Sequence, residues 1–327
     1  MRNRFYILAI DGGGFRGAYS AHFLKRIEEE WRLDWLTQFD MFAGTSTGAI
    51  IAAGLACGLT AGTLYDLYAE HGRSIFGRRW FARLDPFGFT GLFASRYSNR
   101  KLQARLRQEF GEKRLGQITV PLILPAVDIG NGQVHVFKSA YDKGFVRDPE
   151  VLVVDAVLAS CAAPVFFDPH IVEPYRLADG GLWANNPALV AAVDAKRRLG
   201  VQFADLRILS IGTGKSKTFY SRKSGWFIDT FWNAWRGWGF ATRWGSSKFI
   251  DLLLNLQADT AQNMLKLLLQ TDGEEPEQLL RINFESDNCL PLDSPRKLHD
   301  WVRQADSDFT HKAAKVRDFL QFSGGAS

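Results

Sequence analysis

Residues 44–48 (GTSTG) place a serine, Ser46, between two glycines where an apolar run meets a run rich in alanine and glycine. This G-x-S-x-G pattern is typical of a nucleophile on a sharp strand-to-helix turn, where glycines avoid collisions that larger side chains would cause. The following helix would point its N-terminal N–H groups at a reacting oxygen. The pattern is short, and small residues at this spacing also suit helix–strand packing.

A glycine-rich loop, residues 11–17 (DGGGFRG), directly follows the apolar run Phe5–Ile10. Consecutive glycines expose backbone N–H groups in a concave loop, which can hold a phosphate or the oxyanion of a tetrahedral intermediate. The sequence therefore predicts an anion-binding loop at the end of the first strand.

The same loop also fits a dinucleotide-binding pattern. Gly12, Gly14 and Gly17 have the G-x-G-x-x-G spacing, and Asp34 or Glu30 would be the acid that binds the ribose. Because the segment around Asp34 does not follow a strand-like run, dinucleotide binding is the minor alternative.

A single aspartate, Asp179, precedes two glycines in residues 178–181 (ADGG). A carboxylate at such a tight turn can be held against a serine, although an ordinary Asp-Gly turn has the same letters. A free aspartate, with a pKa of about 3.9, is a poor base near neutral pH. It would need an apolar setting that raises its pKa, which the neighbouring Leu182 and Trp183 would provide.

A histidine triad is the alternative to a Ser–Asp pair. The order Ser, Asp, His along the chain requires a histidine after Asp179, and only His299 and His311 qualify. Both lie in the expected helical tail, so we favour the pair.

Apolar strands alternate with amphipathic helices along the chain. The expected strands are Phe5–Ile10, Phe39–Gly44, two strands within Val120–Phe137, and Leu206–Gly214. The expected helices are Ala18–Trp31, Thr47–Leu59, Tyr97–Gly111, Pro149–Pro164, Pro187–Leu199, Ser246–Gln270 and Ser294–Gln321. This order predicts an α/β fold with a mostly parallel central sheet, helices on both faces and a helical C-terminal extension.

The three stretches, with SCAAPVFF (Ser160–Phe167) and SIGTG (Ser210–Gly214), resemble the patatin-like phospholipase family over about Phe5 to Gly214. The resemblance implies a serine acyl hydrolase of the phospholipase A type, with Ser46 as nucleophile and Asp179 as proton acceptor. It implies no metal ion and no cofactor. We therefore expect residues 1–215 to form the catalytic core, with residues 216–327 packed on the same domain.

The resemblance also assigns roles to backbone groups and glycines. The N–H groups of Gly13, Gly14 and Thr47 would form the oxyanion hole. Arg16 would hold a lipid phosphate or support the loop. The remaining motif or substrate-binding positions are Gly12, Gly17, Gly44, Gly48, Gly180 and Gly181.

The net charge of +5 is unevenly spread, with basic stretches at 73–107 and 215–248. Such stretches favour anionic partners such as lipid head groups or nucleotides, or form a solvated face. Residues 75–93 and 226–244 interleave tryptophan and phenylalanine with arginine and glycine, which is typical of a lid or a lipid-contact segment. Packing in the core or in an oligomer contact is the alternative.

Residues 41–65 lack charge but are too rich in glycine and threonine for a membrane span, so we expect a buried strand–turn–helix. The N-terminal apolar run is too short for a signal peptide. We expect a cytoplasmic protein that is peripheral at the inner membrane when active. The widely spaced Cys57, Cys161 and Cys289 are expected to be reduced, buried thiols.

Within the family, the chain resembles bacterial phospholipases that a cyclic dinucleotide activates in anti-phage defence, through the segment Tyr97–Gly111 and the SIGTG strand. This implies membrane phospholipid as substrate and a cyclic dinucleotide as activator. A homo-oligomer is one alternative for the assembly of the chain, and no nucleic acid polymer is expected as a partner. Two other classes remain as alternatives: a nucleotide-binding module with a structural Ser46, and a non-enzymatic membrane-binding protein.

Overall fold

The computed structural model describes residues 4–72, 97–217, 246–269, 276–287 and 290–321. Its framework is an eight-stranded sheet, with a further two-stranded sheet formed by β8 (Lys215–Ser216) and β10 (Glu285–Ser286). The strands of the large sheet are β1 (Phe5–Ile10), β2 (Met41–Gly44), β3 (Leu122–Asp128), β4 (Gln133–Lys138), β5 (His170–Val172), β6 (Tyr175–Asp179), β7 (Leu206–Ile211) and β9 (Leu279–Ile282).

The large sheet is mostly parallel. Its order is β5-β6-β3-β2-β1-β7-β9, and β4 pairs with β3 off this path. The five strands from β3 to β9 run parallel, whereas β4 and β6 are antiparallel to β3 and β5 is antiparallel to β6. Strand direction reverses between β3 and β6, so β6 runs opposite to the five parallel strands.

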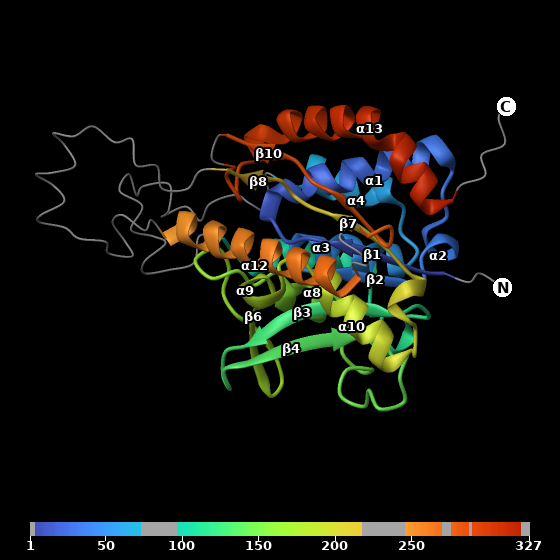
Figure 1. The fold of residues 1–327 in the computed structure, drawn as a ribbon. Coiled ribbons are helices and arrows are strands. Elements are labelled where there is room, and N and C mark those ends of the chain that lie inside the picture. The colour runs from blue at the N-terminus through green and yellow to red at the C-terminus, as the bar shows by residue number, and fades with distance from the viewer. Residues whose placement is uncertain (1–3, 73–96, 218–245, 270–275, 288–289, 322–327) are drawn as a thin grey trace, which may run out of the picture.

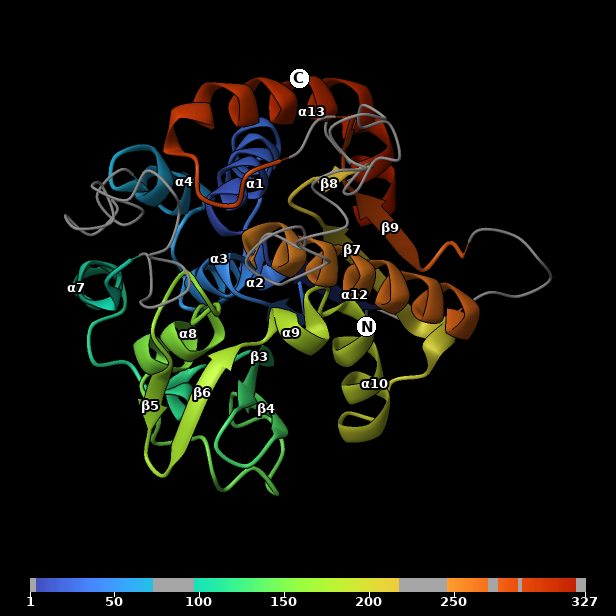
Figure 2. The same ribbon diagram turned by 90° about the vertical axis from the view of Figure 1, so that its left-hand side faces the viewer.

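Helices cover the sheet on both faces (Figures 1 and 2). They are α1 (Gly17–Trp31), α2 (Trp35–Gln38), α3 (Thr47–Ala56), α4 (Ala61–Ala69), α7 (Asn99–Phe110), α8 (Val153–Ser160), α9 (Gly181–Ala184), α10 (Ala188–Arg198), α12 (Ser246–Leu269) and α13 (Leu298–Leu320). In both views α13 lies along the outer side of α1, and the two helices are in contact.

Alternation along β1 explains why both faces are covered. Tyr6, Leu8 and Ile10 belong to the larger core, which includes residues of α1, α3, α4, α8 and α13. Ile7 and Ala9 belong to a second core with residues of α10 and α12. A strand that is apolar on both faces is typical of a parallel sheet between two helical layers.

The structure confirms the expected α/β fold, and residues 41–65 form the expected strand and helix in β2 and α3, followed by the start of α4. None of the helices in the described ranges is long and apolar enough to cross a membrane. The expectation that the C-terminal third is mainly helical was incomplete, because β9 pairs in parallel with β7. α8 begins at Val153, four residues later than expected, and β5 and α4 were not anticipated.

Some expectations concern parts of the chain outside the described residues. These are the two aromatic and basic segments, 75–93 and 226–244, and Cys289.

Candidate active site

The turn that carries Ser46 is strained and tightly packed. β2 ends at Gly44 and α3 begins at Thr47, and Ser46 between them has φ 55° and ψ −123°. A positive φ is uncommon for a residue with a side chain and is concentrated at functional sites. A Cβ on Gly44 would lie 2.1 Å from the carbonyl oxygen of Gly48, and a Cβ on Gly48 would lie 2.2 Å from that of Ile10. Both glycines are therefore required by close backbone approach.

The backbone of Ser46 is held by the end of α8. Its N–H donates to Ser160 Oγ at 3.0 Å, and Ser160 Oγ donates in turn to the carbonyl oxygen of Pro125 at 2.6 Å. The Cys161 thiol donates to the carbonyl oxygen of Ser46 at 3.0 Å. Burial, together with the nearby Asp179 charge, raises the pKa of Cys161, so this thiol keeps the proton that it donates.

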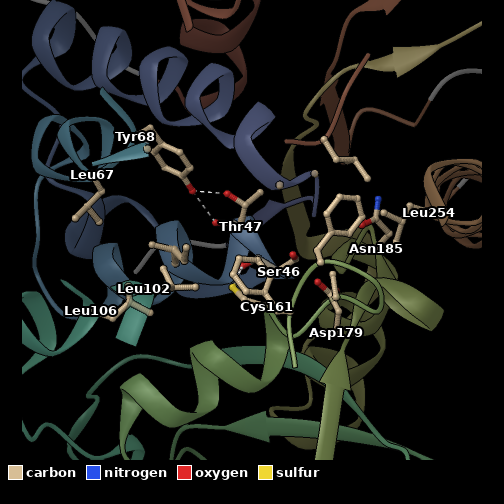
Figure 3. Close-up of a pocket in the computed structure, with 18 of the residues that line it drawn as sticks. Ser46, Thr47, Leu67, Tyr68, Leu102, Leu106, Cys161, Asp179, Asn185 and Leu254 are labelled. Carbon is tan, nitrogen blue, oxygen red and sulfur yellow. Dashed lines mark hydrogen bonds between the residues drawn. The ribbon is translucent and has the colours of Figure 1, made fainter. Parts of the chain in front are cut away.

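Asp179 ends β6 and is buried, with 4% of its surface exposed. Its N–H donates to the carbonyl oxygen of Ala162 at 3.0 Å, and its Oδ1 accepts from the N–H of Gly181 at 2.6 Å. Burial raises the pKa of the Asp179 carboxyl to about 6, although hydrogen bonding from Ser46 and Gly181 opposes this rise. In Figure 3 the side-chain oxygens of Ser46 and Asp179 face each other.

Strand register explains why two residues 133 positions apart meet. Ala43 of β2 pairs with Ile123 of β3, and Ala126 of β3 pairs with Asp179 of β6. The two pairing points thus lie three positions apart on β3, about 10 Å along the strand. The end of α8 bridges this gap by binding the backbones of both Ser46 and Asp179.

The apolar setting of Asp179 does not come from the predicted residues. Leu182 is 36% exposed, and the Trp183 indole donates to the carbonyl oxygen of Ala126. Neither residue lines the pocket that contains Ser46 and Asp179. Leu254 of α12 lies there instead, and a Cβ on Gly181 would lie 2.6 Å from its side chain.

Three backbone N–H groups beside Ser46 have no acceptor among the described residues: those of Gly13, Gly14 and Thr47. All three residues line the pocket. Their neighbours in the loop are engaged, because the Gly12 N–H donates to Asn185 and the Phe15 N–H donates to Leu292. Gly13 and Thr47 are buried and Gly14 is half-buried. Unpaired N–H groups are rare in protein interiors, so these three are available to an oxyanion at this position.

The other predicted glycines allow close packing of the chain around the site. A Cβ would lie 2.4 Å from Asn185 Oδ1 at Gly12, 2.1 Å from Thr47 Oγ1 at Gly17 and 2.2 Å from the Pro125 carbonyl oxygen at Gly180. These glycines shape the walls of the site and do not line the pocket.

Arg16 supports the glycine-rich loop from inside the protein. It is 1% exposed, and its guanidinium pairs with Asp251 of α12 at 2.9 Å. Its Nε also donates to the carbonyl oxygen of Gly13, and its Nη1 donates to that of Leu290, both at 3.3 Å. Each nitrogen of the guanidinium donates a hydrogen bond, and Arg16 does not line the pocket. This contradicts the expectation that it holds a lipid phosphate and agrees with the supporting role.

Two polar residues near the site were missed by the sequence analysis. Arg281 of β9 forms a two-point ion pair with Asp11 at the start of the loop and donates to Ser210 Oγ at 2.7 Å. Asn185 lines the pocket and is buried, and its Oδ1 has no hydrogen-bond partner in the part of the chain that the structure describes. The Asn-Asn-Pro run shortly after Asp179 was the available signal for Asn185, whereas no local pattern marks Arg281.

The residues that dinucleotide binding and a histidine triad would require are not in the expected positions. Asp34 caps α2 by accepting from the Leu36 N–H at 3.1 Å, and Glu30 is exposed on α1, so the dinucleotide pattern lacks its acid. His299 and His311 are exposed on α13. Among the residues that the structure describes, no histidine lines the pocket.

The rest of the pocket is apolar (Figure 3). Tyr68 lines it and hydrogen-bonds to Thr47, and Arg105 of α7 lies at its edge. Its apolar lining includes Ile50, Leu67, Leu102, Leu106, Phe166, Phe167, Ile250, Leu254 and Leu292. Such a lining suits a hydrocarbon chain next to Ser46. In the described ranges, no group of three or more His, Cys, Asp or Glu residues could hold a metal ion.

A family model described as "Patatin-like phospholipase" matches residues 8–192, more than half of the chain. The chain belongs to the patatin-like phospholipase family. The match includes the glycine-rich loop, the Ser46 turn and Asp179. It confirms the expected family, the α/β fold and the expected enzyme class, a lipid ester hydrolase.

Several curated relatives of this patatin-like chain carry functional names. A "cGAMP-activated phospholipase" of Pseudomonas aeruginosa (strain BWHPSA011 / Pa011) is 32% identical over 81% of this chain and 75% of that protein. One of Escherichia coli (strain TW11681) is 33% identical over 64% of this chain and 62% of that protein. "Patatin-like protein 4" of Arabidopsis thaliana is 26% identical over 92% of this chain and 79% of that protein. The chain thus spans less than two thirds of the Escherichia coli relative.

Proposed function

We propose that this patatin-like protein is a phospholipase A-type acyl hydrolase whose chemistry is carried by Ser46 and Asp179. The observation that carries the proposal is their arrangement in one apolar pocket. A serine on a strained turn faces a buried carboxyl whose pKa is raised to about 6, beside three unpaired N–H groups. A carboxyl with this pKa can act as a base near neutral pH.

In the acylation step, Ser46 Oγ attacks the carbonyl carbon of a lipid ester while Asp179 takes the hydroxyl proton. The carbonyl oxygen becomes an oxyanion, which accepts hydrogen bonds from the N–H groups of Gly13, Gly14 and Thr47. The bond to the leaving alcohol then breaks, and this alcohol takes the proton from Asp179. An ester between Ser46 and the fatty acyl group remains.

Deacylation repeats the same proton transfers with water. A water molecule gives a proton to Asp179 as its oxygen attacks the acyl carbon. The second tetrahedral intermediate collapses by breaking the bond to Ser46 Oγ, which regains the proton from Asp179. The products are a free fatty acid and the original enzyme.

The pocket lining supports an acyl chain as the bound part of the substrate. Leu67, Leu102 and Leu106 lie on α4 and α7, beyond Ser46, and offer hydrocarbon contact only. The names of the bacterial relatives support phospholipid as the substrate class. We infer that the protein acts from the cytoplasm as a peripheral protein of the inner membrane, because its proposed substrate is membrane phospholipid.

We also infer that residues 216–327 form one domain with the core, residues 1–215. Three contacts support this: α12 packs on α9 and α10, α13 packs on α1, and Arg281 pairs with Asp11. Without this part of the chain, the glycine-rich loop would lose its ion pairs with Arg281 and Asp251.

Activation by a cyclic dinucleotide is a further proposal, which rests on the names of the bacterial relatives. We expect cyclic GMP-AMP or cyclic UMP-AMP to bind and to increase hydrolysis of lipid vesicles. Isothermal titration calorimetry and an activity assay with each ligand would check this. No binding, together with full activity of the free enzyme, would refute it.

The proposed reaction is tested by fatty acid release from mixed phosphatidylethanolamine–phosphatidylglycerol liposomes, assayed with and without these cyclic dinucleotides. We expect release by the wild type, and a loss of about 1,000-fold or more in Ser46→Ala and in Asp179→Asn. Circular dichroism should show that both variants stay folded. Substantial release by either folded variant would contradict the proposal.

A further inference from the structure

The solvent-facing side of α12 is mostly apolar and uncharged. Among residues 248–269, the part of this helix whose exposure the structure describes, seven positions are exposed and none of them carries a charge: Leu253, Leu256, Thr260, Asn263, Met264, Leu267 and Leu268. The five large apolar side chains are between 37% and 73% exposed. Their spacing places them on one face of the helix, about 20 Å long at 1.5 Å per residue. We call these five residues the outer face of α12.

The charged residues of α12 lie outside this face, and its two lysines, Lys248 and Lys266, are half-buried. Its two acids are engaged in ion pairs, Asp251 with Arg16 at 2.9 Å and Asp259 with Lys215 at 2.5 Å. An apolar helix face without carboxylates is typical of a surface that meets something other than water.

The first turns of the same helix belong to the candidate active site. Ile250 and Leu254 line the pocket, and α12 packs on α9, which directly follows Asp179. Leu253 of the outer face is next in sequence to Leu254, so the outer face begins at the pocket. α12 crosses the front of the molecule in Figure 2.

We propose that the outer face of α12 is the surface with which this protein lies on a phospholipid bilayer. A helix with one apolar side can lie in the plane of the interface with that side among the acyl chains. This proposal rests on the proposed function, because a lipid ester reaches the pocket by the shortest path if the bilayer meets the helix that lines it.

The size of the outer face favours a bilayer over a second copy of the chain. Seven exposed positions on one helix are few beside the roughly 20–30 residues per side that stable protein interfaces contain. The face also lacks the charged or aromatic residues that fix orientation in protein pairs. A helix side that lies among acyl chains is stabilised by its buried apolar area, which the leucines and Met264 supply.

Vesicle flotation tests this surface without any catalysis. The parent protein carries Ser46→Ala, and the vesicles are phosphatidylethanolamine–phosphatidylglycerol. The outer-face variant adds Leu256→Gln, Met264→Gln and Leu267→Gln, and a control variant adds Val134→Gln and Val146→Gln, which replace two other exposed apolar residues. We expect the bound fraction to fall about tenfold or more in the outer-face variant and to stay unchanged in the control. Equal flotation of all three, or none by the parent, would overturn the proposal.

A second measurement distinguishes lost membrane binding from misfolding of the outer-face variant. Leu256→Cys and Val146→Cys would each carry a nitrobenzoxadiazole label, and vesicles should shift the emission to the blue only at position 256. No shift at 256 would overturn the proposal. Light scattering tests whether the outer face instead binds a second copy of the chain. A dimeric parent and a monomeric outer-face variant that float equally would also overturn the proposal. Flotation does not depend on hydrolysis, so failure of the proposed function would be distinguishable from failure of the proposed membrane surface.

Discussion

At the scale of single residues, the chemistry depends on how one carboxyl titrates. Burial raises the pKa of Asp179 to about 6, against the hydrogen bonds from Ser46 and Gly181 that stabilise its charged form. A base must be unprotonated to accept a proton, so its active form is the one present above this pKa. The same burial that makes Asp179 a stronger base therefore restricts its activity at low pH.

We predict that kcat/KM for a soluble ester such as p-nitrophenyl butyrate rises with pH through about 6 and is level above it. Below that pKa it should fall about tenfold per pH unit. The pH profile of the purified enzyme checks this, with circular dichroism at each pH as the control for folding. A profile without a change between pH 5 and 7 would contradict the assigned base.

Asn185 offers a second test at this scale, because the adjacent Asn186 is a matched control. Asn185 Oδ1 lies unpaired in the pocket, whereas the Asn186 side chain accepts from the Ala188 N–H and donates to Gln262. We predict that Asn185→Ala lowers kcat about tenfold or more without loss of stability, since no partner is left unpaired. Asn186→Ala should instead lower the free energy of unfolding by about 1 kcal/mol and keep kcat. Steady-state kinetics and urea unfolding separate the two outcomes, and equal kcat in both variants would exclude a role for Asn185.

At the scale of elements, the end of α8 positions the nucleophile. Ser160 accepts from the Ser46 N–H and donates to Pro125, so the turn, α8 and β3 are joined through one hydroxyl. Ser139 forms the same kind of bridge away from the pocket, because it accepts from the Leu122 N–H and donates to the Val120 carbonyl oxygen.

We predict that Ser160→Ala and Ser139→Ala both lower the free energy of unfolding by about 1–3 kcal/mol, because each leaves a buried N–H unpaired. Only Ser160→Ala should also lower kcat, by about tenfold or more, because the strained turn loses its support. Urea unfolding and soluble-ester kinetics measure the two effects. If kcat falls equally in both variants, Ser160 has no special positioning role.

Local elements of this fold were predictable, and contacts between distant ones were not. The Ser46 turn and the glycine-rich loop are contiguous runs, so glycine spacing and flanking apolar residues predicted both. The meeting of Ser46 with Asp179 depends on β6 running antiparallel to β3, which no local pattern encodes. The resemblance to a family, not periodicity, supplied that pair. The strand β9 was missed because four apolar or basic residues (LLRI) within a polar stretch give a weak signal.

At the scale of the whole molecule, an ion pair joins β1, the first strand of the large sheet along the chain, to β9, its last; the carboxylate is buried and the guanidinium is half-buried. Arg281 of β9 pairs with Asp11 at the end of β1, where burial raises the pKa of the carboxyl and the guanidinium opposes the rise. Removing one partner of a buried pair leaves an uncompensated charge.

We predict that Arg281→Met lowers the free energy of unfolding by about 3–5 kcal/mol, and that adding Asp11→Asn restores part of the loss. Urea unfolding of the single and double variants measures both. A loss below about 1 kcal/mol, or no recovery in the double variant, would contradict the inference that the C-terminal third and the core form one domain.

The central claim concerns Ser46 as a nucleophile that Asp179 activates, and mass spectrometry after treatment with a fluorophosphonate tests it most directly. We predict an adduct on the peptide that contains Ser46, absent in Ser46→Ala and formed at least about 100-fold more slowly in folded Asp179→Asn. An adduct on another residue, or equal rates in the wild type and Asp179→Asn, would contradict the account.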